Sequence, residues 1–311
     1  MHFKSILIVG LLAVTSIHQL SAQVTEGEDK IRKKTIKDTT LGWKKGGVIN
    51  LGMAQASLTN WAAGGESSIA FNGLVSLYGH RVAKKYAWEN YLELGYGLLN
   101  QGNSDLWKKV DDRIDYTSKY GRKIKKSWYY AGLLNFKTQW TNGYNYPNDS
   151  VAISKFMAPG YLLVAVGAEY RPSSNFTLYI APFTSKNTFV LDERLSNQGA
   201  FGVDSSKRVR SEFGGYLRMS WTKDLMENIR FQTKLELFSN YTHNPQNIDV
   251  SWETLLSMKV NKYISVTLGT HLLYDDDIDI SVDENRDGVI DAVGPRVQFK
   301  QVLNVGFSYK F

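Results

Sequence analysis

Hydrophobic and polar residues alternate with a period of two along most of the chain from Gly46 onward. In residues 127–140, for example, Trp128, Leu134 and Trp140 fall on one face and Lys137 falls on the other. Such alternation predicts β-strands that have one apolar and one polar face. About twelve alternating blocks can be distinguished, starting near Gly46, Ser68, Tyr86, Lys109, Ser127, Tyr161, Phe176, Arg208, Ile229, Ile248, Ile264 and Val297. The pattern therefore predicts an all-β protein.

The length of the blocks separates a membrane barrel from a water-soluble sandwich, in which strands also alternate. Strands of soluble proteins have about 5–6 residues, whereas a tilted strand needs about 9–11 to cross a bilayer. Trp128 and Trp140 are twelve positions apart on one face, which corresponds to roughly 28 Å along the membrane normal. This spacing matches two aromatic girdles around an apolar band of about 25 Å.

The connections between the predicted strands alternate in length. Residues 141–160, 184–207 and 275–296 are long connections, while 121–126, 171–175 and 261–263 are short. Bacterial barrels combine short periplasmic turns with long extracellular loops. The sequence thus predicts a single antiparallel transmembrane β-barrel of the up-and-down type. It also predicts a location in the outer membrane, with both termini in the periplasm.

The last predicted strand carries Phe307, Tyr309 and Phe311 at alternating positions. A terminal strand that ends on Phe, with an aromatic residue two positions earlier, resembles the insertion signal read by the outer-membrane assembly machinery. We therefore expect this machinery to be a partner during insertion and outer-membrane lipid to be a partner afterwards.

The N-terminal residues do not alternate. Residues 1–22 have the features of a secretory signal peptide, with Lys4 before an apolar run at 6–14 and a Leu-Ser-Ala cleavage sequence at 20–22. The alternative, a single membrane anchor, requires a longer apolar run. Residues 23–45 are polar and charge-rich, which predicts a flexible periplasmic tail, and residues 46–311 are predicted to form the barrel.

Composition excludes several classes of protein. A mean hydropathy of -0.30 argues against a bundle of membrane helices, and the 13% aromatic content favours sheet. The sequence contains no cysteine, which excludes disulfides and thiol chemistry. The formal net charge of +7 is spread along the chain and forms no single basic patch in the sequence, so a nucleic-acid partner is not expected.

Three strings resemble a known family. They are QASLTNWAAGG at 55–65, FSNYTHNPQNIDVSW at 238–252 and LLYDDDI at 272–278. They resemble the domain-of-unknown-function family numbered 3078, which comprises outer-membrane β-barrel proteins of Bacteroidota-type bacteria. The resemblance extends over nearly all of the mature chain. It implies the barrel fold and the location, and it implies no activity.

An acidic segment near the C-terminus matches most of a calcium-binding loop. Its spacing offers side-chain oxygens at alternating positions and a sharp turn at Gly288, with ligands expected from Asp283, Asn285, Asp287, the Val289 carbonyl and Asp291. Gly294 replaces the usual bidentate glutamate, so we expect weak affinity for Ca2+. The alternative is a solvated acidic turn, which Asp-Gly sequences favour.

Strand parity predicts a charged lumen. The expected lumen charge network comprises Glu89, Glu93, Arg113, Asp115, Lys137, Arg210, Glu212, Arg218, Arg230, Lys234, Glu236 and Glu253. About twelve strands leave room for a narrow pore, but side chains can also fill such a barrel. The network is therefore either the wall of a small-solute channel or an ion-pair network that closes the lumen.

Enzyme signatures are weak. The sequence contains none of the GxSxG, HExxH or GxxxxGK[ST] motifs. His243, opposite the acidic residues 275–277, offers a resemblance to the cleft of a barrel protease, but a loop-ordering role for His243 is the alternative. We expect a non-enzymatic protein, either a porin-like channel for small polar solutes or an accessory subunit of a larger outer-membrane complex with a calcium-ordered extracellular loop.

Overall fold

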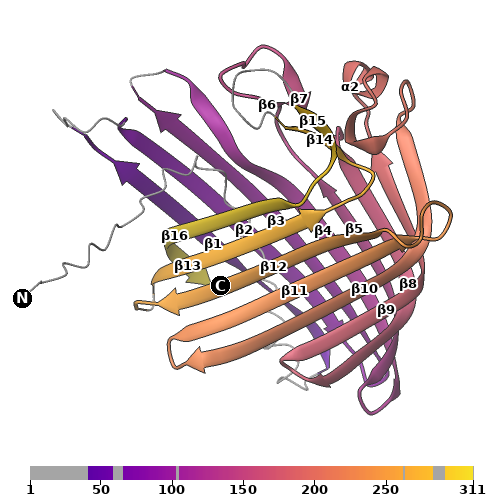
Figure 1. The fold of residues 1–311 in the computed structure, drawn as a ribbon. Coiled ribbons are helices and arrows are strands. Elements are labelled where there is room, and N and C mark those ends of the chain that lie inside the picture. The colour runs from indigo at the N-terminus through magenta and orange to yellow at the C-terminus, as the bar shows by residue number, and fades with distance from the viewer. Residues whose placement is uncertain (1–40, 59–65, 103–104, 262, 283–290, 311) are drawn as a thin grey trace, which may run out of the picture.

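The computed structural model describes residues 41–58, 66–102, 105–261, 263–282 and 291–310. Within these residues, twelve long strands form one closed barrel: β1 (Gly42–Ala56), β2 (Ser68–Val82), β3 (Tyr86–Gln101), β4 (Trp107–Lys125), β5 (Trp128–Thr138), β8 (Gly160–Ser173), β9 (Phe176–Phe189), β10 (Val209–Met226), β11 (Ile229–Asn240), β12 (Ile248–Lys259), β13 (Ile264–Tyr274) and β16 (Gln298–Lys310). Neighbouring strands are antiparallel and follow chain order around the barrel (Figure 1). The predicted up-and-down barrel is confirmed.

The predicted strand positions agree closely with the structure except at the first strand. Tyr86 and Ile229, for example, begin strands as predicted, whereas β1 begins at Gly42 and not at Gly46. Residues 42–45 therefore belong to the barrel and not to a tail. Trp43 pairs with Arg81 of β2, but two adjacent lysines and two adjacent glycines, at 44–47, hide the alternation in the sequence.

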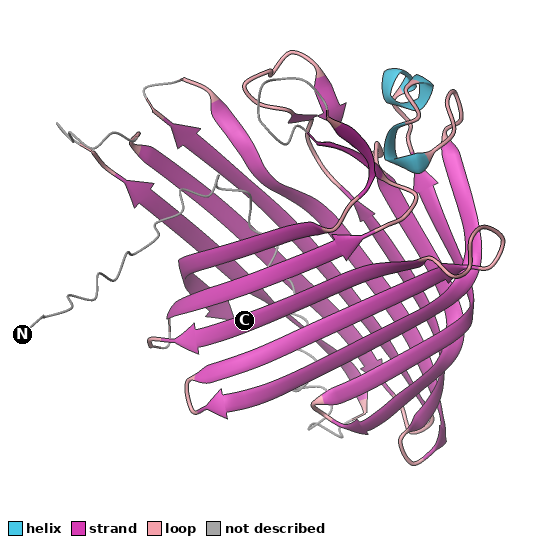
Figure 2. Cartoon of the chain, in the orientation of Figure 1, coloured by secondary structure: helices cyan, strands magenta, loops and turns pink. Residues whose placement is uncertain are grey.

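The long loops contain short elements that the sequence did not predict. These are β6 (Gly143–Tyr144), β7 (Ala152–Ser154), the helix α2 (Glu193–Asn197), the 3-10 helix η1 (Ala200–Gly202), β14 (Asp279–Val282) and β15 (Ala292–Pro295). They gather at one end of the barrel, and the short turns lie at the other (Figure 2). No helix in the described part of the chain is long and apolar enough to cross a membrane.

The Asp192 side chain caps the N-terminus of α2. It accepts a hydrogen bond from the backbone N–H of Leu195 at 3.0 Å and lies 2.6 Å from Lys155 Nζ. The hydrogen bond from Lys155, followed by the one from Leu195, holds the pKa of Asp192 below its usual value. This pair fastens the loop before β8 to the loop after β9.

The two faces of the barrel wall differ as strand parity predicts. Leu134 is 37% exposed on the outer face, while its neighbour Leu133 is 3% exposed on the inner face. Exposed large hydrophobic residues such as Val166 and Leu303 continue around the outside, whereas buried charged residues lie inside. An apolar exterior around a polar interior is the arrangement of an outer-membrane β-barrel.

Aromatic side chains form a belt at each end of the apolar surface. At the short-turn end, ring centroids lie 4.9–5.7 Å apart in the pairs Trp43–Trp88, Tyr86–Tyr120, Trp128–Tyr170 and Tyr263–Phe307. The long-loop end has the pairs Phe71–Trp107 and Phe213–Tyr241. Trp128 and Trp140 are both exposed at opposite ends of β5, although Trp140 follows the last strand residue, Thr138. Two such belts mark the two membrane–water interfaces.

The barrel closes where β1 meets β16. This seam pairs Val48–Gly52 with Gly306–Lys310. In contrast, β1 pairs with β2 along its whole length, from Gly42 to Ala56. The described seam is therefore much shorter than the neighbouring strand pairing.

Candidate functional site: the charged lumen

Four charged residues form a closed network in the lumen near the short-turn end, and we call them the quartet. Glu89 lies on β3, Lys119 on β4, and Glu169 and Arg171 on β8. Lys119 Nζ lies 3.0 Å from a Glu89 oxygen and 2.7 Å from a Glu169 oxygen. The Arg171 guanidinium lies 3.1 Å from Glu89 and 2.8 Å from Glu169. Each carboxylate thus contacts both cations.

The quartet is balanced, with two acids and two bases. Both glutamate side chains are only 2% exposed. Buried carboxylates are tolerated where cations and hydrogen bonds compensate for the lost hydration. Because β5 lies between β4 and β8 in the barrel, the quartet spans the inner face of four strands.

Aromatic rings surround the quartet. Arg171 lies over the Tyr129 ring at 5.4 Å. The fully buried His80 packs edge-on against Tyr91 at 4.7 Å and against Tyr78 at 5.1 Å. These contacts fill the lumen beside β2 and β3 with packed side chains.

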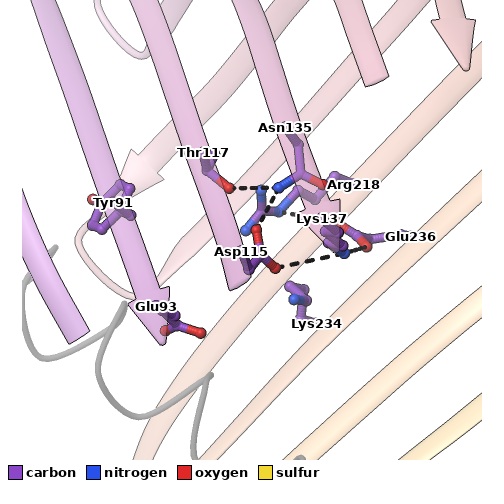
Figure 3. A pocket seen from close by; sticks show the side chains of 9 residues that line it. All are labelled: Tyr91, Glu93, Asp115, Thr117, Asn135, Lys137, Arg218, Lys234 and Glu236. Atoms are coloured by element: carbon purple, nitrogen blue, oxygen red, sulfur yellow. Dashed lines mark hydrogen bonds and ion pairs between the residues drawn. The ribbon is translucent and has the colours of Figure 1, made fainter. Parts of the chain in front are cut away.

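A polar cavity lies in the lumen on the long-loop side of the quartet. Figure 3 shows the side chains that line it. It has a volume of about 20 Å³ and is lined by Tyr91, Glu93, Asp115, Thr117, Asn135, Lys137, Arg218, Lys234 and Glu236. These residues come from β3, β4 and β5 on one side and from β10 and β11 on the other. A second cavity, also of about 20 Å³, shares Tyr91, Thr117 and Arg218 with the first, so the two are adjacent.

Lys137 makes only long ion-pair contacts in the cavity. Its Nζ lies 3.8 Å from Asp115 and 3.9 Å from Glu236, and its side chain is 38% exposed. The two carboxylates are held more tightly: Asn135 donates to Asp115 at 2.6 Å, and the Tyr216 hydroxyl donates to Glu236 at 2.7 Å. The acids are therefore fixed, while the ammonium group of Lys137 faces open space.

A third network lies at the long-loop mouth, and we call it the mouth cluster: Lys186, Arg210, Glu212, Asp249, Asp275 and Asp277. Lys186 Nζ lies 2.6 Å from Asp249, 3.2 Å from Asp275 and 3.7 Å from Glu212. Arg210 lies 3.0 Å from Glu212 and 3.3 Å from Asp277. The mouth cluster has four acids and two bases, and it joins three strands to the segment that follows β13.

Most of the predicted lumen charge network is brought together in these three places. Glu89 is in the quartet. Glu93, Asp115, Lys137, Arg218, Lys234 and Glu236 line the cavity. Glu253 lies 2.8 Å from Lys234. Arg210 and Glu212 are in the mouth cluster.

Two predicted network residues form ion pairs outside these three groups. Arg113 lies 3.3 Å from Asp111, and Arg230 lies 2.6 Å from Asp224 at the short-turn rim.

The structure also shows network residues that the predicted set omits. Arg171 falls in the segment 171–175, which the sequence assigns to a short turn, but β8 continues to Ser173. Lys186 falls in the predicted long loop 184–207, but β9 continues to Phe189. The alternation continues for a few residues beyond the predicted ends of these two strands, and following it would have identified both residues.

The predicted calcium loop falls mainly outside the described residues, since Asp283, Asn285, Asp287 and Val289 lie in the segment 283–290. Asp291 is described and is exposed. Among described residues, no group of three or more His, Cys, Asp or Glu side chains is arranged to hold a metal ion. The calcium site remains a prediction.

Of the predicted insertion signal, Phe307 is exposed on β16 beside the Tyr263 ring. Tyr309 pairs with Ile49 across the seam, and Phe311 lies outside the described residues. The role of the three residues in insertion remains a prediction.

The protease-like arrangement is not formed in the described part of the chain. His243 is exposed and contacts its neighbour Asn244 at 3.3 Å. Asp276 accepts hydrogen bonds from Tyr274 at 2.9 Å and from Asn247. Among these residues, no hydrogen bond or ion pair joins His243 to the acidic residues 275–277.

A family model described as "Protein of unknown function (DUF3078)" matches residues 53–144, which confirms the resemblance over that segment, including the string at 55–65. The strings at 238–252 and 272–278 lie outside the match. No curated protein matches the chain.

Several solved structures are similar to the chain. The NanC porin is 10% identical with a TM-score of 0.40, and the match covers 86% of this chain and all of that one. An outer membrane channel from Pseudomonas putida F1 is also 10% identical with a TM-score of 0.40, covering 88% of this chain and 96% of that one. OmpT, an outer membrane protein of Vibrio cholerae, is 8% identical with a TM-score of 0.32, covering 88% and 98%.

Proposed function

We propose that this outer-membrane β-barrel is a channel for small polar solutes. The observation that carries the proposal is the polar cavity around Lys137, which is lined from opposite walls of the barrel by residues of both charges. The distances from Lys137 Nζ to Asp115 and to Glu236, 3.8 and 3.9 Å, are longer than those of direct hydrogen bonds. A lysine held this loosely leaves space that a small hydrophilic solute can share.

The quartet is then the narrowest part of the proposed path. Its contacts at 2.7–3.1 Å join β3, β4 and β8 along one side of the lumen. We infer a low-conductance channel, because a solute has to pass beside these paired side chains. In this proposal the short turns and both termini face the periplasm, and the mouth cluster faces the exterior.

Single-channel recording in planar bilayers tests the proposal with the purified full-length protein. We expect discrete conductance steps, and we expect Lys137→Glu to change their size because it reverses a charge in the cavity. Lys207→Glu is the matched control, since Lys207 is exposed in a long loop, and it should leave the steps unchanged. Silent membranes with folded wild-type protein would contradict the channel. Silence together with a co-purifying outer-membrane protein would favour the alternative, an accessory subunit of a larger complex.

A combined variant tests the position of the constriction. Replacing all four quartet residues, as Glu89→Gln, Lys119→Met, Glu169→Gln and Arg171→Met, removes two acids and two bases together and leaves no unpaired charge from the quartet. We expect larger conductance steps than those of the wild type. Unchanged steps from a folded quadruple variant would place the constriction elsewhere.

A further inference from the structure

Two neighbouring turns at the short-turn end carry a dense set of basic residues, which we call the basic patch: Arg81, Lys84, Lys85, Arg122, Lys123, Lys125 and Lys126. All seven are exposed. Residues 81–88 and 121–130 contain no aspartate or glutamate. The turns are in direct contact, because the backbone N–H of Lys123 donates to the Lys85 carbonyl at 3.0 Å. Seven positive charges therefore share one side of the barrel rim.

The basic patch differs from the other charged regions in its lack of counter-charges. In the described part of the chain, none of its seven residues forms an ion pair with a carboxylate. The turn between β10 and β11 provides the contrast, because Lys223 there is accompanied by Asp224 and Glu227, and Asp224 binds Arg230 at 2.6 Å. An uncompensated cluster of this size repels itself unless an external anion binds.

The position of the two arginines points to the membrane interface. Arg81 pairs directly with Trp43 of β1 and with Trp88 of β3, and the two indole rings lie 5.7 Å apart. His80 is fully buried on the inner face, so Arg81 lies on the outer face beside these exposed rings.

The same arrangement recurs two strands farther on, on β4. Arg122 pairs with Tyr86 of β3 and with Tyr130 of β5. Tyr130 is strongly exposed on the outside, and Tyr86 stacks on Tyr120 at 5.5 Å. Ile124, two residues beyond Arg122, is also exposed. Both guanidinium groups are thus interleaved with aromatic and apolar side chains at the level where acyl chains meet headgroups.

We propose that the basic patch binds the phosphate headgroup of an anionic glycerophospholipid in the leaflet that the short turns face. Arg81 and Arg122 are the primary phosphate ligands, because guanidinium binds phosphate with paired hydrogen bonds. The five turn lysines at 84, 85, 123, 125 and 126 add attraction at longer range. The exposed rings of Trp43, Trp88 and Tyr130 contact the glycerol region and upper acyl chain. A soluble anionic partner would use the charges but would leave these rings without a contact.

Native mass spectrometry of the folded full-length protein in detergent tests the site, with cardiolipin, phosphatidylglycerol and phosphatidylcholine added in turn. We expect retention in that order, because cardiolipin carries two phosphates and phosphatidylcholine has no net charge. The double variant Arg81→Gln, Arg122→Gln should weaken cardiolipin retention by about tenfold or more. Lys223→Gln is the matched control, since Lys223 is exposed at the same end on β10, and it should retain the lipid as the wild type does.

Further arms separate the lipid from other anions. Inorganic phosphate at millimolar concentration should not displace cardiolipin if the rings also contact the lipid. Arg81→Lys with Arg122→Lys should recover part of the retention, because the charge remains while the paired hydrogen bonds are lost. Heat-dependent gel mobility confirms that each variant is folded. Equal retention of the three lipids, unchanged retention in the folded double glutamine variant, or preferential binding of lipid A or of a soluble peptidoglycan fragment would overturn the proposal.

Discussion

The quartet and the mouth cluster are both ion-pair networks in the lumen, but they differ in charge balance. In the quartet, two carboxylates face two cations, and all four residues lie on barrel strands. In the mouth cluster, four carboxylates share Lys186 and Arg210, and Asp275 and Asp277 come from the segment after β13. The first network joins strands to strands. The second fastens a loop to strands.

The two networks therefore have different roles in the same barrel. A buried network with equal numbers of acids and bases is not stabilised by added ions, so the quartet serves to hold neighbouring strands together. A network with an excess of acid attracts cations from outside, and the mouth cluster holds its loop through Lys186 and Arg210. We therefore expect changes at the quartet to affect the whole barrel, and changes at the mouth cluster to affect the loop and the passing solute.

The largest effect is expected from Arg171→Met. This change leaves two buried glutamates with only Lys119 between them, and breaking a buried pair in this way costs about 3–5 kcal/mol. Denaturant unfolding in a defined detergent or lipid measures the loss in free energy of unfolding. Lys207→Met removes an exposed pair with Asp204 and should leave the free energy of unfolding almost unchanged. Equal losses in the two variants would show that the quartet is not a stabilising network.

A smaller and more local effect is expected from Lys186→Met. Three carboxylates then lose their shared cation, and a loss of about 1–3 kcal/mol is reasonable for such partly buried groups. Because Asp275 belongs to the segment after β13, proteolytic cleavage within 275–297 should become faster while the barrel stays folded. Cleavage at the wild-type rate would mean that Lys186 does not hold this segment.

Calcium is expected to affect only the acidic segment after β13. Residues 275–296 contain eight acids and two arginines, and a dication reduces the repulsion among them. Adding calcium to chelated protein should protect residues 279–294 from proteolysis. The double change Asp283→Ala, Asp287→Ala should abolish the protection without unfolding the barrel. The same cleavage rate with and without calcium in the wild type would leave only an acidic turn.

The smallest effect is expected from Asp249→Asn on ion selectivity, and it rests on the proposed channel. Removing one of four mouth acids lowers the local cation concentration, so the reversal potential in a salt gradient should move away from cation preference. Asp224→Asn, on the exposed rim at the other end, is the control and should change the potential less. An equal shift in both variants would assign the selectivity to the net charge of the protein and not to the mouth.

The sequence predicts the wall of the barrel better than its contents. Leu133 and Leu134 lie on opposite faces as their parity requires, because a strand leaves only two directions for side chains. The pairing of Lys137 with Glu236 is different, since it depends on which strands face each other across the closed barrel, and no local pattern encodes this. The roles of Arg171 and Lys186 were missed because strand ends are harder to locate than strand centres. The short helix α2 was missed because five residues carry no helical periodicity.

The short seam between β1 and β16 makes the barrel mechanically uneven. Hydrogen bonds between two strands share an applied load along their paired length. The seam pairs only Val48–Gly52 with Gly306–Lys310, so it resists shear less than the full-length pairing of β1 with β2. Under a pulling force applied across the wall, rupture should begin along this line and leave the β1–β2 hairpin intact. A cylinder split there has two free edges, and free strand edges pair readily with other chains. The same line is thus where mechanical damage would turn into aggregation.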